Sequence, residues 1–162
     1  MPRSLLASLA LAASLVAVPV QAQQQLVSTF NETVLRSAVQ SLGGTIGQAT
    51  VENGVPFYQI TLTNGVPAVA NLDQCEGQSC RSLIIVASMP LPQGRTIAEL
   101  DELLRRVNNS VPPAKVFRVD QTVLVQTYII ADAGITQGNL QAQMNVFADV
   151  ALSMYQTLNA PE

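Results

Sequence analysis

The sequence predicts a single α+β domain, with helices packed on an antiparallel sheet in the order α-β-β-β-β-α-β-β-α. Three observations predict this class. Apolar residues recur at helical spacing in one segment near each end of the mature chain and in one segment in the middle. Between these segments lie short β-type runs, separated by turn sequences such as Asn-Gly, which favour hairpins. A cluster of strands with helices around it is typical of α+β domains.

The first 22 residues have the pattern of a secretory signal peptide. One cation, Arg3, precedes an apolar core from Leu5 to Val18, and small residues lead up to an expected cleavage site after Ala22. A membrane-spanning helix needs about 20 apolar residues, and this core is shorter. We therefore expect export across the inner membrane to the periplasm, one mature domain over residues 23–162, and no stable membrane insertion after cleavage. An uncleaved anchor is the alternative.

Composition excludes several function classes. Without Arg3, seven basic residues stand against eleven acidic ones, so we expect no nucleic-acid partner. The absence of histidine removes the commonest general base, the commonest metal ligand and every Ser-His or Cys-His nucleophile pair. Phosphate-loop, dinucleotide-binding and Gly-x-Ser-x-Gly motifs are also absent from the sequence. We expect no cofactor and no catalytic residues.

The N-terminal half is predicted as one helix followed by four strands. Apolar residues at helical spacing run from Phe30 to Leu42, with Ser28 or Asn31 as the N-cap and Gly43 as the stop. The strands TIGQATV, VPFYQITL and VPAVANL follow, separated by the turn sequences ENG and TNG. RSLIIVASM forms a further strand, which is reached across a loop that contains both cysteines.

The middle helix is predicted over RTIAELDELLRRVNN. Thr96 and Glu99 form a capping box at its start. Its apolar face consists of Ile97, Leu100, Leu103, Leu104 and Val107. Two acid-first pairs at a spacing of four residues favour the helix, namely Asp101 with Arg105 and Glu102 with Arg106.

The C-terminal part is predicted as a hairpin and a long helix. AKVFRV and TVLVQTYII form the hairpin, across Asp120 and Gln121. TQGNLQAQMNVFADVALSMYQTLN forms the helix, which stops near Pro161. Its apolar stripe consists of Leu140, Met144, Phe147, Ala151, Met154 and Leu158.

Cys75 and Cys80 are the only cysteines, in the stretch NLDQCEGQSCRSLIIVAS. A structural zinc site needs four ligands, so two thiols would have to be shared between two chains. Thiol-disulfide exchange usually uses Cys-x-x-Cys at a helix start, whereas this spacing is longer and a strand follows. An exported chain with an even number of cysteines favours a plain disulfide, which would hold the EGQS turn and the register of the flanking strands.

Several segments of the sequence resemble the YbjN-like family. They are C-x4-C-R-S-L before a strand, a helix opening on Thr with acidic residues, AKVFRVDQTVLVQTYI and GITQGNLQAQMNVFADVALSMY, which together cover Phe30 to Leu158. The resemblance implies an exported bacterial member with the fold of type III secretion chaperones and a role in protein binding or regulation. The family often has Asn-x-Trp-Asn in the middle helix, where this chain has Asp101, Leu103 and Leu104, so no role of that Trp or Asn carries over.

Two predicted strands are apolar on both faces. In RSLIIVASM, Leu83 and Ile85 point to one face, while Ile84 and Val86 point to the other. An antiparallel sheet with helices on one face usually has polar residues on the opposite face. Either the chain's own helices cover both faces, or Ile84 and Val86 belong to a dimer interface or to a docking surface for another protein.

We therefore predict an exported, non-enzymatic, chaperone-like or regulatory binding module, whose partner is an unidentified protein or a second copy of itself. One alternative is a carboxylate-based envelope hydrolase that uses acids such as Asp73, Glu76, Asp120 and Asp132. It would need two carboxylates about 5 to 10 Å apart in a deep pocket. The other alternative is a small-ligand binder, which would need a sizeable enclosed apolar pocket.

Overall fold

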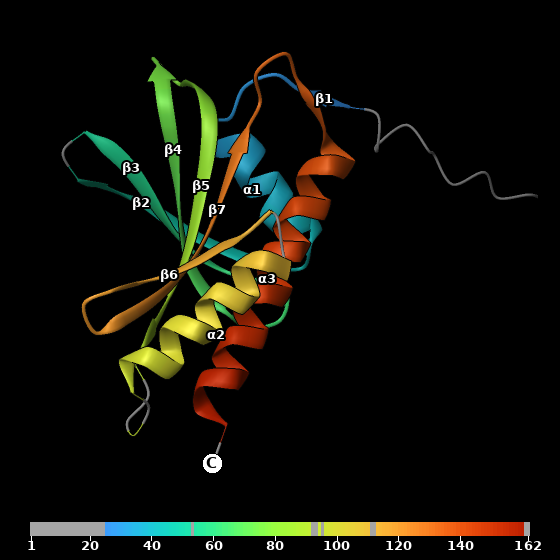
Figure 1. Ribbon diagram of the computed structural model, residues 1–162. Helices are drawn as coiled ribbons and strands as arrows, with labels where there is room; N and C mark the ends of the chain where they lie inside the picture. The colour runs from blue at the N-terminus through green and yellow to red at the C-terminus, as the bar shows by residue number, and fades with distance from the viewer. Residues whose placement is uncertain (1–24, 53, 92–93, 95, 111–112, 161–162) are drawn as a thin grey trace, which may run out of the picture.

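A computed structural model describes residues 25–52, 54–91, 94, 96–110 and 113–160, and the predicted signal peptide lies outside these residues. The described part of the chain is an α+β domain, as predicted (Figure 1). Its elements in chain order are β1 (Leu26–Val27), α1 (Glu32–Ser41), β2 (Thr45–Glu52), β3 (Val55–Thr61), β4 (Pro67–Glu76), β5 (Ser79–Pro90), α2 (Ile97–Ser110), β6 (Lys115–Val119), β7 (Thr122–Ile130), β8 (Ile135–Thr136) and α3 (Gln137–Asn159). Among these described elements, no helix is both long enough and apolar enough to span a membrane.

The main sheet has six antiparallel strands in the order β2-β3-β4-β5-β7-β6. Its first four strands follow one another along the chain, as predicted, but Cys75 and Cys80 lie within β4 and β5 and not in the loop between them. After α2 the β6–β7 hairpin returns with β7 against β5, which leaves β2 and β6 as the two edges. β1 and β8 form a separate pair. The sequence did not predict this pair, because each strand is too short to show a period.

Side-chain hydrogen bonds set the N-termini of α1 and α2, as predicted. Asn31 is the N-cap of α1, since its side chain accepts a bond of 2.9 Å from the N–H of Val34, which decides between the two predicted caps. Thr96 and Glu99 form the predicted capping box, with the Thr96 N–H donating to the Glu99 carboxylate at 2.9 Å and the Glu99 N–H donating to Thr96 Oγ1 at 3.3 Å.

The two ion pairs predicted on α2 are confirmed only in part: Asp101 does not pair with Arg105, whereas Arg105 and, to a smaller extent, Arg106 lower the pKa of the Glu102 carboxyl. Arg105 binds Glu102, three residues before it, at 2.7 Å. Asp101 instead lies 3.7 Å from Arg118 of β6, because this side of α2 packs against that strand. Tertiary contact therefore replaces the spacing of four residues that helix geometry alone favours.

The core lies between the sheet and the helices, which all lie on the same side of the sheet (Figure 1). From the central strand, Leu83 and Ile85 are fully buried in this layer. Every member of the apolar stripe predicted on α3 is buried in the same core. The helices in the described chain therefore leave the other face of the sheet without a helical layer.

Candidate binding surface

The sheet face opposite the helices is the first candidate surface, and we call it the open face. Ladder registers align its apolar side chains in adjacent rows, with Ile84 beside Tyr128 and Val86 beside Val69. Ile84 and Val86 are half-buried rather than covered. The apolar side chains of the open face are Phe57, Val69, Ile84, Val86, Phe117, Val119, Leu124, Tyr128 and Ile130.

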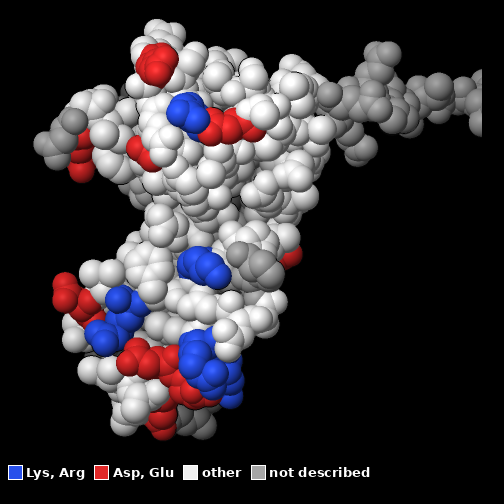
Figure 2. Space-filling view, turned by 45° about the horizontal axis from the view of Figure 1, so that its top comes forward, with Lys and Arg blue, Asp and Glu red and all other residues white. Residues whose placement is uncertain are grey.

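The open face is concave. In Figure 1 the β2–β3 and β6–β7 hairpins both reach out to the left of the middle strands. Figure 2 shows the molecular outline hollowed between an upper and a lower lobe. Right-handed twist turns successive strands relative to one another, so a six-stranded sheet brings its two end hairpins forward around its middle strands.

The open face carries little charge. In strands β3 to β7 register gives the open face one acid, Asp73, and one base, Lys115, on opposite sides of the Ile84 row, and Glu52 at the end of β2 adds a second acid. Asp73 is half-buried and Lys115 is exposed. A contact on this face would therefore depend mainly on apolar burial, which salt screens little.

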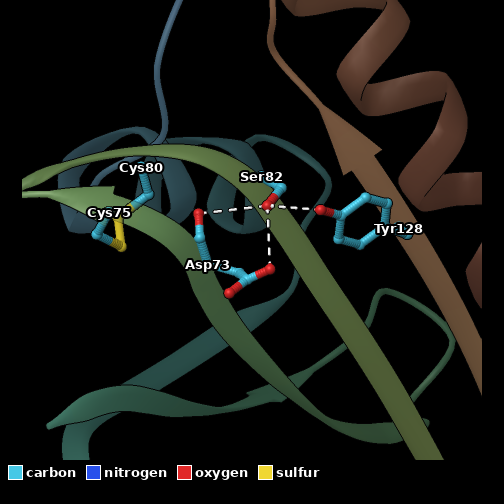
Figure 3. The surroundings of a disulfide bond; sticks show 5 residues. All are labelled: Asp73, Cys75, Cys80, Ser82 and Tyr128. Carbon is cyan, nitrogen blue, oxygen red and sulfur yellow. Dashed lines mark hydrogen bonds between the residues drawn. A yellow bond between two sulfur atoms is a disulfide. The ribbon is translucent and has the colours of Figure 1, made fainter.

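A hydrogen-bonded cluster closes one end of the open face (Figure 3). Ser82 lies 3.2 Å from the Asp73 carbonyl and 3.4 Å from its carboxylate, while Tyr128 donates to Ser82 at 3.1 Å. Gln74 in turn donates to Tyr128 at 3.0 Å. Ser82 is fully buried, so this hydroxyl is a structural link between β4, β5 and β7 and is shielded from any substrate.

Cys75 and Cys80 form the predicted disulfide, which joins two directly paired residues of β4 and β5 (Figure 3). The strands turn at Gly77, whose φ of 64° suits glycine. With both sulfurs bonded to each other, neither is available to a metal. Among the described residues, no group of three or more Cys, Asp or Glu side chains is arranged to hold a metal ion.

The backbone of Cys80 also anchors the start of the domain, which the sequence did not indicate. Phe30 and Cys80 exchange two backbone hydrogen bonds, of 2.7 and 2.8 Å. The Phe30 side chain is fully buried. Cys80 is therefore held by a covalent bond on one side and by the N-terminal segment on the other.

A second concave region is an open groove of about 1230 Å³ between α1 and the tips of the β2–β3 and β4–β5 hairpins. Its lining includes Glu32, Arg36 and Tyr58. Glu32 and Arg36 form an ion pair of 2.7 Å. Burial raises the pKa of the Tyr58 hydroxyl, and the neighbouring Glu32 carboxylate raises it further. The groove is open, and polar and apolar groups line it about equally, whereas a small-ligand binder would be indicated by an enclosed apolar pocket.

The predicted carboxylates do not gather in this groove. Asp73 lines it, together with Glu32, which the sequence did not single out. Asp132 instead receives two bonds from Arg81, of 2.8 and 2.6 Å, and the Arg81 guanidinium holds its pKa below the usual range. A general acid needs a raised pKa, so Asp132 is unsuited to that role.

The fold and its surfaces define a small α+β domain with one helix-covered and one open sheet face. The sequence profile of the YbjN family, described as "Putative bacterial sensory transduction regulator", matches residues 31–160. The chain belongs to this family, which confirms the predicted resemblance, and the family description names a regulator and no enzymatic activity.

One solved structure supports the fold assignment. The chain is similar to the crystal structure of YbjN from E. coli, described as "a putative transcription regulator", with a TM-score of 0.56 and 14% sequence identity. The similarity covers 85% of this chain and 100% of that one. At this identity the likeness concerns the fold alone. The curated proteins contain no match to this chain.

Proposed function

We propose that this chain is a non-enzymatic, chaperone-like or regulatory module of the bacterial cell envelope that binds another protein through its open face. The observation that carries this proposal is the row of half-buried apolar side chains around Ile84 and Val86, on which none of the described helices packs. A regulator acts by binding, and the family description is consistent with that role.

The size of the open face suits a small protein contact. Strands about 4.8 Å apart and residues about 3.4 Å apart give a face of roughly 500 Å². That area is within the range of the largest patches that monomers expose, which are often functional, and it matches one side of an interface of about 1,000 Å² in total, below the standard size. Its concave shape favours a convex partner element, such as a helix about 10 Å wide.

The envelope location is supported by two features. The first 22 residues have the pattern of an export signal. The Cys75–Cys80 disulfide is a bond that persists in oxidising compartments such as the periplasm. Export to the periplasm would explain both features together.

The test is affinity capture from the native cell envelope with matched surface variants. Ile84→Asp places a charge in the middle of the open face. Tyr155→Asp is the control, because Tyr155 is an exposed apolar residue on α3, and α3 lies on the other side of the sheet. We expect a reproducible protein partner with the wild type and Tyr155→Asp, and its loss with Ile84→Asp.

Circular dichroism and thermal unfolding must first establish that both variants are folded. If Ile84→Asp retains the partner as well as the wild type does, the open face is not the binding surface. If the wild type captures no partner but forms a dimer that Ile84→Asp disrupts, the occupant of the face is a second copy of the chain.

A further inference from the structure

The two edges of the main sheet differ in how their outer backbone groups are satisfied. β6 is a short edge of five residues. Asn108 of α2 covers it, since its side chain donates to the Val116 carbonyl at 2.7 Å and accepts from the Val116 N–H at 2.8 Å. Lys115 and Arg118 add charge to the same strand. Capping and charge are the usual means of closing a strand edge.

The β2 edge is open over its second half. Arg36 donates to the carbonyls of Ile46 and Gly47, at 3.3 and 3.4 Å, and so covers the start of the strand. From Gln48 to Glu52 every residue is exposed, and among bonds between described residues none reaches the outer backbone of this stretch. The stretch has no proline, and its single charge is at Glu52, its last residue.

The ladder with β3 indicates which backbone groups of β2 point outward. Val51 is opposite Pro56, which has no N–H. Pro56 therefore fits a non-hydrogen-bonded position of the antiparallel ladder, so the N–H and C=O of Val51 point away from β3. By the same alternation, the backbone N–H and C=O of Ala49 also point outward, whereas those of Thr50, which lies between Ala49 and Val51, bond to β3.

We propose that two copies of the chain pair through their β2 edges, antiparallel and centred on Thr50. This register brings Ala49 of each copy opposite Val51 of the other, so the outward groups of both copies meet and form about four backbone hydrogen bonds. Thr50 lies opposite its own copy, in a Thr–Thr pair of the kind that stabilises sheets.

The charge pattern fits this self-pairing. Glu52 comes opposite Gln48 of the second copy, so no like charges face each other. The bulge between Ile46 and Ala49 bends the strand and sets the end of the ladder. In Figure 1 the β2–β3 hairpin stands clear of the helices, so a second strand has access to this edge. The open faces of both copies remain free, which distinguishes this dimer from one formed through the open face.

Sedimentation velocity over a wide concentration range tests the pairing. Val51→Pro removes an outward N–H but no bond to β3, and proline is tolerated at such edge positions. Val51→Thr is the control, because it keeps the N–H and the β-branched shape. We expect a monomer–dimer equilibrium for the wild type and the control, and a dissociation constant raised about tenfold or more for Val51→Pro.

A charge pair at Thr50 tests the register and does not depend on how well the proline variant folds. Thr50→Lys and Thr50→Glu each place like charges directly opposite in the proposed dimer. Each variant alone should be monomeric at concentrations where the wild type is a dimer. An equal mixture of the two should restore the dimer, because only pairing centred on residue 50 brings the opposite charges together.

Two results would overturn the proposal. One is a wild-type protein that stays monomeric at all concentrations. The other is a dimer that the Val51 and Thr50 variants leave intact. Ile84→Asp should not affect this dimer, so a failure of edge pairing is distinguishable from a failure of partner binding on the open face.

Discussion

Breaking the Cys75–Cys80 disulfide should lower the free energy of unfolding by about 2 kcal/mol. The two cysteines are five positions apart, and closing so short a loop removes about 7 cal/mol/K of entropy from the unfolded chain, or about 2 kcal/mol at 25 °C. For a domain of this size, a loss of 1 kcal/mol lowers Tm by about 3 °C, so Tm should fall by about 6 °C.

The loss should stay small because non-covalent pairing continues on both sides of the bond. Glu76 remains opposite Ser79 at the turn, and Asp73 remains opposite Ser82 further along the ladder. Both backbone bonds between Phe30 and Cys80 are also independent of the sulfurs. The hairpin should therefore keep its register, and binding through the open face should persist after reduction.

Urea unfolding of the oxidised protein, the dithiol-reduced protein and the Cys75→Ser/Cys80→Ala variant measures the effect. Alanine suits position 80 because Cys80 is buried, whereas Cys75 is exposed. The reduced wild type is the matched control, since it differs from the oxidised form only at the sulfurs. A loss above about 4 kcal/mol would refute the local-loop reasoning, because it would mean that reduction also releases the N-terminal segment and its buried Phe30.

Two further predictions concern the edge cap and the groove. Asn108→Ala should lower the free energy of unfolding by about 1 to 3 kcal/mol, because it leaves the N–H and C=O of Val116 without their side-chain partner. Asn109→Ala, at an exposed position, is the control. Equal unfolding curves for the two variants would contradict the prediction. The pKa of the Tyr58 hydroxyl is higher in the folded chain than in the unfolded chain, where it is near 10. The protonated hydroxyl therefore contributes its full stability below about pH 10, and this contribution is lost as the pH rises from there towards the folded pKa. Tyr58→Phe should therefore reduce the alkaline loss of stability in unfolding curves measured between neutral and strongly alkaline pH, and an unchanged alkaline loss would exclude Tyr58 as its source.

The elements of the fold were predictable because their signals are local. Thr96 and Glu99 lie three residues apart, so the capping box is visible in the sequence and has the same bonds in the structure. The stripe on α3 repeats over the whole helix and therefore identifies its buried face. The disulfide was also predictable, because the absence of histidine leaves few other uses for two close cysteines.

The remaining features depend on residues far apart in the chain. The ion pair between Arg118 and Asp101 forms because β6 packs against α2, and no pattern within α2 indicates it. The pairing of Phe30 with Cys80 spans the first three strands of the main sheet. Neither contact produces a periodic pattern in the sequence, so neither could be predicted from it.

The open face was predictable only in part. Apolar residues on both faces of β5 indicated that something covers Ile84 and Val86, but the chain's own helices and another molecule were equally compatible with that pattern. In the described chain the helices pack on the opposite face of the sheet (Figure 1), and this layout depends on where α2 and the β6–β7 hairpin return along the sheet. Packing of this kind is determined by the whole domain.

The Asn108 cap on β6 has a consequence for assembly. A sheet with two unprotected edges can add copies at both ends and grow into a fibre, as heterologous contacts that do not close tend to do. This sheet offers one edge, β2, while Asn108 occupies the backbone of the other at Val116. The proposed pairing through β2 would therefore use up the available edge of both copies, and growth would stop at two.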